Sequence, residues 1–423
     1  MDKILDAFKG AFNDPLETRD PALRECEILA ALPAQIAHAK KNAPHFAKLL
    51  AAFDPSNITT RAALAELPVT RKSDLHDLQK LSMPFGGLNA TSLGKLARLF
   101  VSPGPIYDPE GRGADYWRTA RAFYAAGFRA DDIVHNTFSY HLTPAGSMFE
   151  SGAHAIGCAV IPAGVGQTEM QIATIAALQP NGYVGTPSFL KVLLEKADEF
   201  NTDVSSIKKA LVSGEAFLPS VKALLKSRGI DAYQCYGSAD LGVIAYESSA
   251  REGLIVDEGV LVEIVRPGTG DPVADGEVGE VVVTTFNRDY PLIRFATGDL
   301  STVMLGSMSG ASPCGRTNTR IKGWMGRADQ TTKVRGMFVH PHQVAEVVKR
   351  HPQIARARLI VSQLDGADAM TLKCEFADAS ATLAGIAESI RDITKLRGEI
   401  ENVALHSLPN DGKVIEDVRP VVS

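Results

Sequence analysis

The sequence predicts an α/β protein with a large N-terminal domain, built of mainly parallel sheets flanked by helices plus a β-rich layer, and a small C-terminal α+β domain. Between residues 114 and 286, short apolar runs alternate with amphipathic helical segments, which is typical of a parallel sheet. After residue 258, β-forming segments are joined by turns of Gly, Pro and Asp, which favours antiparallel pairing. An α+β pattern then follows residue 326, so we expect domains at residues 1–326 and 327–423.

The elements are expected in the following order. The first hundred residues show helical periodicity, with interruptions expected at Pro33 and Pro44. Five strands should then each run into a turn: DIVHNTF (132–138), CAVIPAG (158–164), NGYVGTPS (181–188), KALVSGEAF (209–217) and AYQCYGS (232–238). The β layer comprises VLVEIVRPG (260–268), GEVGEVVVTTF (276–286) and PLIRFATGDLSTV (291–303), and the last domain comprises VHPHQVAEVVKRH (339–351), ARARLIVSQ (355–363) and MTLKCEFAD (370–378).

Composition excludes several classes of protein. The chain has 423 residues, of which 45% are hydrophobic and 22% are charged, as in an ordinary globular protein of two or three domains. The net charge of −5 excludes a broadly basic nucleic-acid binder. No run approaches the roughly 18 apolar residues of a membrane span, and the N-terminus lacks a secretory pattern. We therefore expect a cytoplasmic protein with neither a nucleic acid nor a membrane as partner.

The five cysteines are far apart and form no C-x-x-C pair, so we expect neither disulfides nor a zinc site. Each is expected to be a small buried apolar residue. They are Cys26, Cys158, Cys235, Cys314 and Cys374.

Four segments carry groups suited to nucleotide chemistry. Asp299 follows a strand in a Thr-Gly-Asp turn, where a carboxylate could accept both hydroxyls of a ribose. Arg327 lies in a charged turn before the last domain, and the turn is either simply solvated or a hinge whose arginine reaches a nucleotide. Tyr236 could cover an adenine and Asp240 could hold a metal-bound phosphate. Lys413 follows Gly412 in a polar turn, where an ammonium could meet developing phosphate charge.

In this order and spacing, the segments resemble the adenylate-forming superfamily of acyl-CoA ligases, and most closely the phenylacetate-CoA ligase family. The resemblance covers nearly the whole chain. It is carried jointly by LPVTRKSDLHDLQ (67–79), GCAVIPAGVGQTEMQI (157–172), VGTPSFL (184–190), SGEAF, YGSAD, PLIRFATGDLS, GRADQTTKVRG (326–336) and DGKVIEDVRP (411–420).

The resemblance also implies roles for individual residues. The C-terminal domain would be mobile, Asp329 its hinge and Lys413 the catalytic lysine, while Asp299 would bind ribose and Arg327 the nucleotide. The adenine and phosphate site would be lined by Gly214, Glu215, Ala216, Tyr236, Gly237 and Ser238. Asp240 stands where the family has Glu, which is one methylene longer, and is the magnesium ligand that we expect.

Two longer segments also depart from the family pattern. The segment from Arg98 to Gly113 replaces a glycine-rich phosphate loop and keeps only Ser102 and Gly104 as loop elements. Its prolines remove N–H donors, and Asp108 and Glu110 are expected to add negative charge where triphosphate should lie. The acid-binding wall, in turn, is expected to comprise Tyr140, His141, Thr143 and Pro144.

The resulting hypothesis is an ATP-dependent carboxylic acid-CoA ligase that acts through an acyl-adenylate on an aryl or other small organic acid. His141 is equally well a structural residue or a substrate contact, and with Thr143 it would suit an acid smaller or more polar than phenylacetate. ATP and CoA are the co-substrates, with Mg²⁺ and without zinc. Two alternatives stay open: an adenylating enzyme with a different acceptor, and a non-catalytic relative that binds nucleotide or acyl-CoA. The sequence also leaves a homodimer open.

Overall fold

The structure is a computed structural model that describes residues 10–102, 104–307, 312–328, 330, 332–335, 337–364, 367–377 and 383–419. Its contacts divide the chain into two compact units. The first unit is Met1–Val262, Val283–Phe295 and Val303–Trp324, and the second unit is Glu263–Val282, Ala296–Thr302 and Met325–Ser423. The second unit thus includes parts of the β layer as well as the C-terminal residues. The expected domain boundary between residues 326 and 327, with a mobile C-terminal domain, stays a prediction.

The first unit is built on an eight-stranded sheet with the order β14-β10-β9-β8-β7-β6-β4-β5. All five strands expected before residue 240 are present, and they pair in parallel, which confirms the α/β class. They are β4 (Ile133–Asn136), β5 (Ala159–Pro162), β6 (Gly182–Gly185), β7 (Lys209–Val212) and β8 (Asp231–Ser238). The sheet continues antiparallel through β9 (Gly242–Tyr246), β10 (Leu254–Val256) and β14 (Arg320–Ile321).

The strand order defines where a ligand can bind. From β4 the chain crosses to β5 on one side and then returns to β6 on the other side of β4. Connections that leave in opposite directions open a crevice outside the carboxyl ends of the strands. The loops after β4 and β6 therefore border the expected binding crevice.

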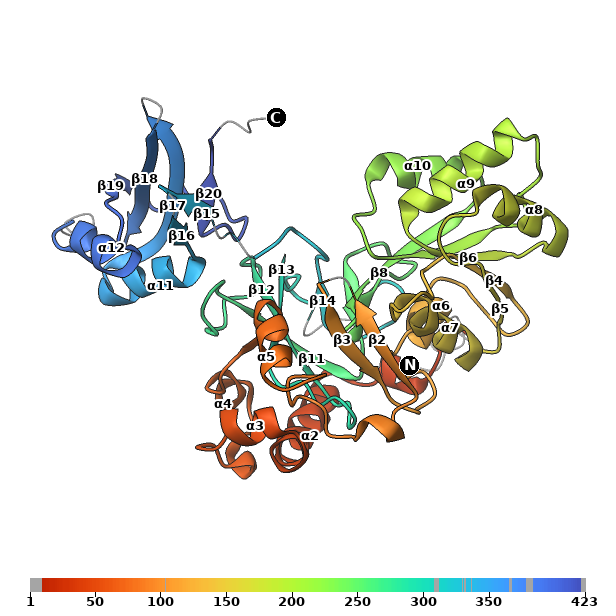
Figure 1. Cartoon of the computed structure of the whole chain (residues 1–423), viewed down its shortest axis with the longest axis horizontal. Helices are drawn as coiled ribbons and strands as arrows, with labels where there is room; N and C mark the ends of the chain where they lie inside the picture. The colour runs from red at the N-terminus through yellow and green to blue at the C-terminus, as the bar shows by residue number, and fades with distance from the viewer. Residues whose placement is uncertain are drawn as a thin grey trace. The chain divides into compact units, whose positions relative to one another are not determined.

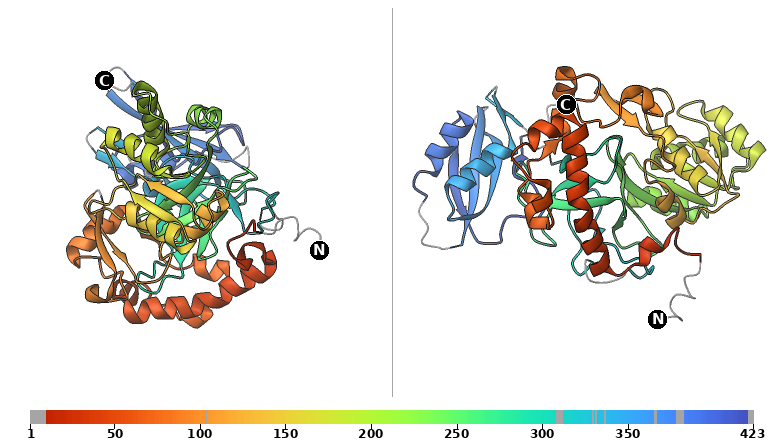
Figure 2. Two further views of the ribbon diagram at one scale, coloured as in Figure 1. Left: turned by 90° about the vertical axis from the view of Figure 1, so that its right-hand side faces the viewer. Right: turned by 90° about the horizontal axis from the view of Figure 1, so that it is seen from below.

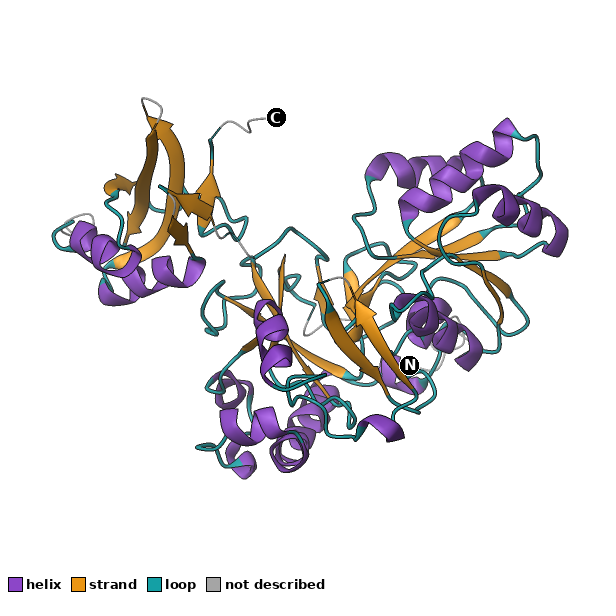
Figure 3. Cartoon of the chain, viewed as in Figure 1, coloured by secondary structure: helices purple, strands orange, loops and turns teal. Residues whose placement is uncertain are grey.

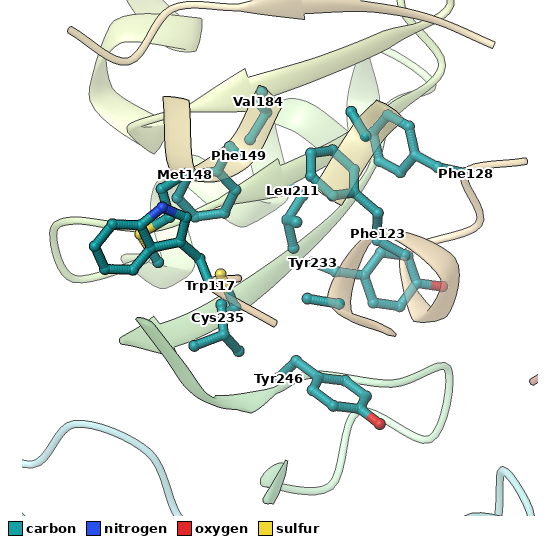
Figure 4. Packing of buried hydrophobic residues seen from close by; sticks show 14 of the residues in the cluster. Trp117, Phe123, Phe128, Met148, Phe149, Val184, Leu211, Tyr233, Cys235 and Tyr246 are labelled. Atoms are coloured by element: carbon teal, nitrogen blue, oxygen red, sulfur yellow. The ribbon is translucent and has the colours of Figure 1, made fainter. Parts of the chain in front are cut away.

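Helices cover both faces of this sheet. Figure 1 shows α8 (Thr168–Leu178), α9 (Pro187–Glu199) and α10 (Pro219–Ser227) on one face, and α6 (Ala120–Ala125) and α7 (Ala145–Ala155) on the other. Aromatic side chains fill the layer between the sheet and α6 and α7, and Trp117, Phe123, Phe128 and Phe149 are buried there (Figure 4). Each such buried side chain contributes about 1.5–3 kcal/mol of hydrophobic stabilisation.

The N-terminal helices are α2 (Pro21–Asn42), the long red helix in Figure 2, followed by α3 (Pro44–Leu49), α4 (Arg61–Ala65) and α5 (Leu75–Leu81). The expectation that Pro33 interrupts the first helix is wrong, because α2 runs through it. The fully buried Leu32 and Ile36 on either side of Pro33 explain how packing offsets the lost hydrogen bond. Pro44 begins α3, where a missing N–H costs nothing.

Strands of the β layer form a sheet with the order β1-β13-β12-β11. Their bounds are Thr70–Arg71 (β1), Val260–Val265 (β11), Gly279–Thr285 (β12) and Phe295–Ser301 (β13). A separate two-stranded hairpin, β2 (Arg98–Ser102) and β3 (Ile106–Glu110), belongs to the first unit.

The last hundred residues form the expected α+β module. Its sheet has the order β19-β18-β17-β20, and α11 and α12 pack along one face (Figure 3). The bounds are α11 (Pro341–Arg350), β17 (Ile354–Leu364), β18 (Ala367–Phe376), α12 (Ile386–Thr394), β19 (Glu399–Val403) and β20 (Ile415–Asp417), with a hairpin of β15 (Thr332–Val334) and β16 (Met337–Val339) before them.

All five cysteines are free thiols. Four are buried as expected, whereas Cys26 is exposed because it lies on the outer side of α2. Within the described ranges, no helix combines the length and the apolar character needed to cross a membrane.

Candidate functional site

The turn after β7 lies at the crevice between β4 and β6. A Cβ atom at Gly214 would lie 3.6 Å from Phe138, which follows β4, and 3.6 Å from Thr186, which follows β6. Gly214 has φ +85°, a left-handed conformation that favours glycine. The strand ends therefore bring the SGEAF turn to the place where the topology predicts a ligand.

Glu215 and Ala216 are exposed at this turn. Glu215 Oε1 accepts a 2.7 Å hydrogen bond from the backbone N–H of Ser188, in the first turn of α9. A carboxylate is favoured there by the helix dipole. Glu215 thus links the turn after β7 to the helix that follows β6.

The YGSAD turn follows β8. A Cβ atom at Gly237 would lie 2.5 Å from the carbonyl oxygen of Gly242, so only glycine fits beside β9. Tyr236 and Ser238 are half-buried. The Ser238 hydroxyl donates to Asp240 Oδ2 at 3.2 Å, which orients that carboxylate.

Asp240 also forms an ion pair that the sequence did not indicate. Lys72 Nζ lies 2.6 Å from Asp240 Oδ2, while the buried Oδ1 has no hydrogen-bond partner among the residues that the structure describes. Lys72 belongs to the recognised segment LPVTRKSDLHDLQ, but only the fold reveals that it meets a residue 168 positions away.

An unpartnered carboxylate oxygen is a suitable donor for Mg²⁺, which prefers oxygen ligands. Asp240 thus offers an oxygen of the type that Mg²⁺ prefers, but its side chain is 1% exposed, so its role as a magnesium ligand stays a prediction. In the described parts of the chain, His, Cys, Asp and Glu form no group of three or more that could hold a metal by themselves. Any ion at Asp240 would take further ligands from the substrate phosphates and from water, as Mg²⁺ usually does.

The segment that was expected in place of a phosphate loop forms the hairpin of β2 and β3. Ser102 donates its hydroxyl to the carbonyl of Ile106 at 3.2 Å, closing the turn. The N–H of Val101 donates to the carbonyl of Leu142 at 2.9 Å, so the hairpin borders the segment expected to line the acid pocket.

Asp108 and Glu110 do not face an open phosphate site. Asp108 is 0% exposed and Glu110 is 3% exposed, and Pro109 between them is buried as well. Burial raises the pKa of Asp108 to about 8, and nearby Asp240 adds to the rise. The expected phosphate repulsion is wrong for Asp108, because its side chain is fully buried and the raised pKa favours its neutral form.

The buried Glu110 carboxylate, unlike that of Asp108, is paired with an arginine. Burial raises its pKa, while the Arg98 guanidinium, 2.9 Å away, opposes the rise. Asp108 has no such ion pair: neither of its carboxylate oxygens has a hydrogen-bond partner within the described residues, although the Ser102 hydroxyl lies near enough to lower its pKa.

Two members of the expected acid-pocket wall are tied internally. The Tyr140 hydroxyl donates to Glu150 at 2.7 Å and accepts from the Asn136 amide at 2.8 Å, and burial raises its pKa. Thr143 donates to the carbonyl of Ser139 at 3.2 Å. Both hydroxyls thus have partners in the fold.

The remaining two members of the wall differ in exposure. Pro144 is buried, whereas His141 is exposed. Of the four predicted wall residues, His141 is the one whose polar group is most accessible to a ligand. Glu150 and Asn136, which hold Tyr140, gave no recognisable pattern in the sequence.

The second unit brings Asp299 and Arg327 together. Arg327 Nη1 lies 2.8 Å from Asp299 Oδ1, and the two residues form an isolated β-bridge. A Cβ atom at Gly298 would lie 2.7 Å from Arg327 Nη2, so the glycine makes room for the guanidinium. The Arg327 side chain is 55% exposed and that of Asp299 is 16% exposed, so the guanidinium is the more accessible member of the pair.

Lys413 is held by other contacts of the same unit. Its side chain is 48% exposed and its Nζ lies 3.5 Å from Glu416 Oε1. Gly412, before it, has φ +71° and allows the turn. Asp329, the expected hinge, lies outside the described residues.

Comparison with known proteins shows the family. A family model described as "AMP-binding enzyme" matches residues 114–287. The chain is 33% identical to the phenylacetate-coenzyme A ligase of Aromatoleum evansii over 383 residues, covering 86% of this chain and 84% of the relative. It is 30% identical to the phenylacetate-coenzyme A ligase of Thermus thermophilus, covering 81% and 79%.

Solved structures share the fold. A 2-hydroxyisobutyryl-CoA ligase in an open conformation with 2-HIB-AMP and CoA matches with a TM-score of 0.69 and 24% identity, over 93% of this chain and 90% of that one. The same enzyme in its thioesterification state matches with a TM-score of 0.69 and 23% identity, over 97% and 93%. At this identity the likeness supports the adenylate-forming fold.

Proposed function

The chain belongs to the phenylacetate-CoA ligase family, and from this membership we propose that it is an ATP-dependent ligase that joins an aryl or other small organic acid to CoA. The observation that carries the proposal is the contact between Asp299 and Arg327, because it joins a carboxylate suited to a ribose and an accessible guanidinium suited to a phosphate.

The first step forms an acyl-adenylate. A carboxylate oxygen of the acid attacks the α-phosphorus of ATP, the bond to the bridging oxygen breaks, and pyrophosphate leaves. The Lys413 ammonium stabilises the negative charge that develops on the carboxylate and the α-phosphate oxygens. Removing such a group costs a factor of about 100 or more in rate.

The nucleotide contacts are divided among several turns. Tyr236 covers the adenine, and the turns at Gly214 to Ala216 and Gly237 to Ser238 offer backbone groups to the adenine and the phosphate, with Ser102 at the hairpin. Asp299 accepts the ribose hydroxyls. Asp240 would hold a Mg²⁺ ion, which supplies charge neutralisation at the phosphates.

The second step forms the thioester. The CoA sulfur attacks the acyl carbon, the bond to the AMP oxygen breaks, and the thiol proton is released. The C-terminal domain, residues 327–423, rotates about Asp329 between the two steps, as hinge motions do when one scaffold carries two reactions. Lys413 would then act in the first step alone.

Exposure supports a pocket in which His141 contacts the acid, beside the ring of Tyr140 and the backbone of Thr143 and Pro144. An imidazole at this wall favours an acid smaller or more polar than phenylacetate. ATP and CoA as substrates support a cytoplasmic location, and we leave a homodimer to be measured.

The test is calorimetric titration with ATP, followed by pyrophosphate release across a panel of aryl and small hydroxy acids, with and without CoA. We expect acid-dependent pyrophosphate release, and AMP release that requires CoA. An enzyme that releases pyrophosphate with every acid but never forms a CoA thioester would contradict the proposed acceptor. Failure to bind ATP or any acyl-adenylate would contradict the ligase itself.

A further inference from the structure

The side chain of Gln330 forms hydrogen bonds to the backbone of the turn that carries Lys413. Its Nε2 donates to the carbonyl of Gly412 at 2.9 Å, and its Oε1 accepts from the N–H groups of Val414 and Ile415. The bond to Ile415 is 2.8 Å long. One side-chain amide thus bonds to the backbone immediately before and after the lysine.

These backbone groups need an outside partner because of their place in the sheet. β20 is the edge strand beside β17, and the carbonyl of Val414 already accepts from the N–H of Leu359 at 2.9 Å. The N–H groups of Val414 and Ile415 are instead satisfied by Gln330. An edge strand whose outward amides are paired by a fixed side chain loses the freedom to fray.

A buried arginine secures the turn from its other side. Arg358 of β17 is 3% exposed, and it donates to the Pro409 carbonyl at 3.0 Å and pairs with Asp411. Its other nitrogen lies 3.0 Å from Glu416, whose second oxygen faces the Lys413 ammonium. Two side chains therefore hold a turn whose lysine is itself exposed.

We propose that Gln330 is a positioning residue for Lys413, which fixes the lysine turn to the segment that joins the C-terminal module to the rest of the chain. The inference rests on the proposed role of Lys413 in adenylation. Gln330 directly follows Asp329 in the sequence, so the group that grips the lysine turn lies next to the proposed hinge. The lysine turn then follows the movement of this segment.

The chemical consequence is specific to one half-reaction. Transition-state stabilisation by a charged group depends on its position being set before reaction, and a displacement of about 1 Å can cost a factor of 100. Loosening the turn should therefore slow adenylation, while thioester formation from a ready-made acyl-adenylate does not use the lysine. A residue that merely stabilised the domain would affect both half-reactions alike.

The test compares Gln330→Met with Gln343→Met. Gln343 is a matched control, because its amide also makes two backbone hydrogen bonds in this module, to His340 N–H and the Ile393 carbonyl, each 3.0 Å long. Adenylation is measured as pyrophosphate release with phenylacetate as probe acid, and thioester formation is measured from phenylacetyl-adenylate and CoA. Melting temperature and hydrogen exchange of the Val414 and Ile415 amides are recorded for each variant.

We expect Gln330→Met to slow adenylation at least tenfold, to leave thioester formation within twofold, and to speed exchange of the two amides. Gln343→Met should leave both rates unchanged. Gln330→Glu keeps the oxygen that accepts from both amides, so it should recover part of the lost rate, and it replaces the methionine variant if that one does not fold.

Two outcomes would overturn the inference. Equal slowing of both half-reactions, or full adenylation by Gln330→Met, would show that Gln330 does not position the lysine. Lys413→Ala, measured in parallel, distinguishes a failure of the proposed role of Lys413 from a failure of the inference about Gln330. If that variant adenylates normally, the proposed role of Lys413 and the inference fail together, whereas loss with Lys413→Ala but not with Gln330→Met rejects the inference alone.

Discussion

The β2–β3 hairpin and the Lys413 turn both carry ionisable residues, but the surroundings of these residues are opposite. In the hairpin, Asp108 is buried without a hydrogen-bond partner among the described residues, and its pKa is raised to about 8. In the turn, Lys413 is exposed and the surrounding backbone is held by Gln330 and Arg358.

This contrast separates stability from chemistry. A carboxyl group deprived of water changes its protonation instead of offering charge to a ligand, so it affects folding more than binding. An exposed ammonium on a secured turn keeps its charge and can reach a reacting group. We therefore expect substitutions in the turn to impair the reaction without changing stability. Substitution of Asp108 in the hairpin should change stability without impairing nucleotide binding.

The largest effect is expected for Lys413→Ala. Acyl-adenylate formation should fall by about 100-fold or more, because the ammonium no longer stabilises developing charge. Thioester formation from a preformed acyl-adenylate and the melting temperature should hardly change. Rapid-quench measurement of the two half-reactions checks this. Equal loss in both would show that the Lys413 turn has a structural role, like the hairpin.

Asp299→Asn tests a carboxylate whose side chain is 16% exposed, which lies between the buried Asp108 and the exposed Lys413. The change keeps the volume and removes the charge that should accept the ribose hydroxyls, and a hydrogen bond to a charged group contributes about 1.5–3 kcal/mol. AMP and ATP affinity should fall by roughly ten- to a hundredfold. Calorimetry that gives unchanged affinity for both nucleotides would exclude Asp299 from the site.

Asp108→Asn should change the pH dependence of stability. The unfolded carboxyl loses its proton near its ordinary pKa of 3.8, whereas the folded one keeps it up to about 8. The folded state binds more protons in this window, so wild-type stability falls as pH rises from about 4 to about 8. The variant lacks this decline, and melting curves at several pH values should show it gaining a few degrees relative to wild type by about pH 8.5.

Asp108→Asn also tests whether this carboxyl group is structural or faces the phosphates. Because Asp108 is fully buried and its raised pKa favours the neutral form, its replacement should leave ATP and AMP affinity unchanged at pH 7. A clear tightening of ATP binding would restore the sequence-based expectation that this carboxylate faces the phosphates. Parallel melting curves for wild type and variant across the whole pH range would show that the carboxyl does not govern stability.

The smallest effect is expected for Asp417→Asn in the C-terminal module. Hydrogen bonds from Arg419 and Thr332 hold the pKa of Asp417 well below its usual range. Its contribution is therefore present at neutral pH and is lost as pH falls through the lowered pKa, the opposite sign to Asp108. Surface pairs of this kind contribute at most about 1 kcal/mol, so melting should shift slightly at pH 7 and less in high salt; a large shift would contradict the exposed character of this region.

Much of the fold follows from local patterns in the sequence. The five parallel strands, the C-terminal α+β module and the turns at Gly214, Gly237 and Gly412 were predictable, because alternation of apolar residues and the position of glycines act over a few neighbouring residues. Family resemblance added the proposed roles of Asp299, Arg327 and Lys413. The expectation that Pro33 interrupts a helix was wrong, since packing of Leu32 and Ile36 outweighs the local rule.

What the sequence by itself determined is thus the class of fold and the residue types available for nucleotide chemistry. Tertiary structure alone decided that Lys72 meets Asp240, that Asp108 faces inward and that Gln330 holds the Lys413 turn. The physical reason is that these contacts join positions from 82 to 168 residues apart or depend on which face of a hairpin packs inward. Such contacts leave no local pattern, because each partner alone looks like an ordinary solvated side chain.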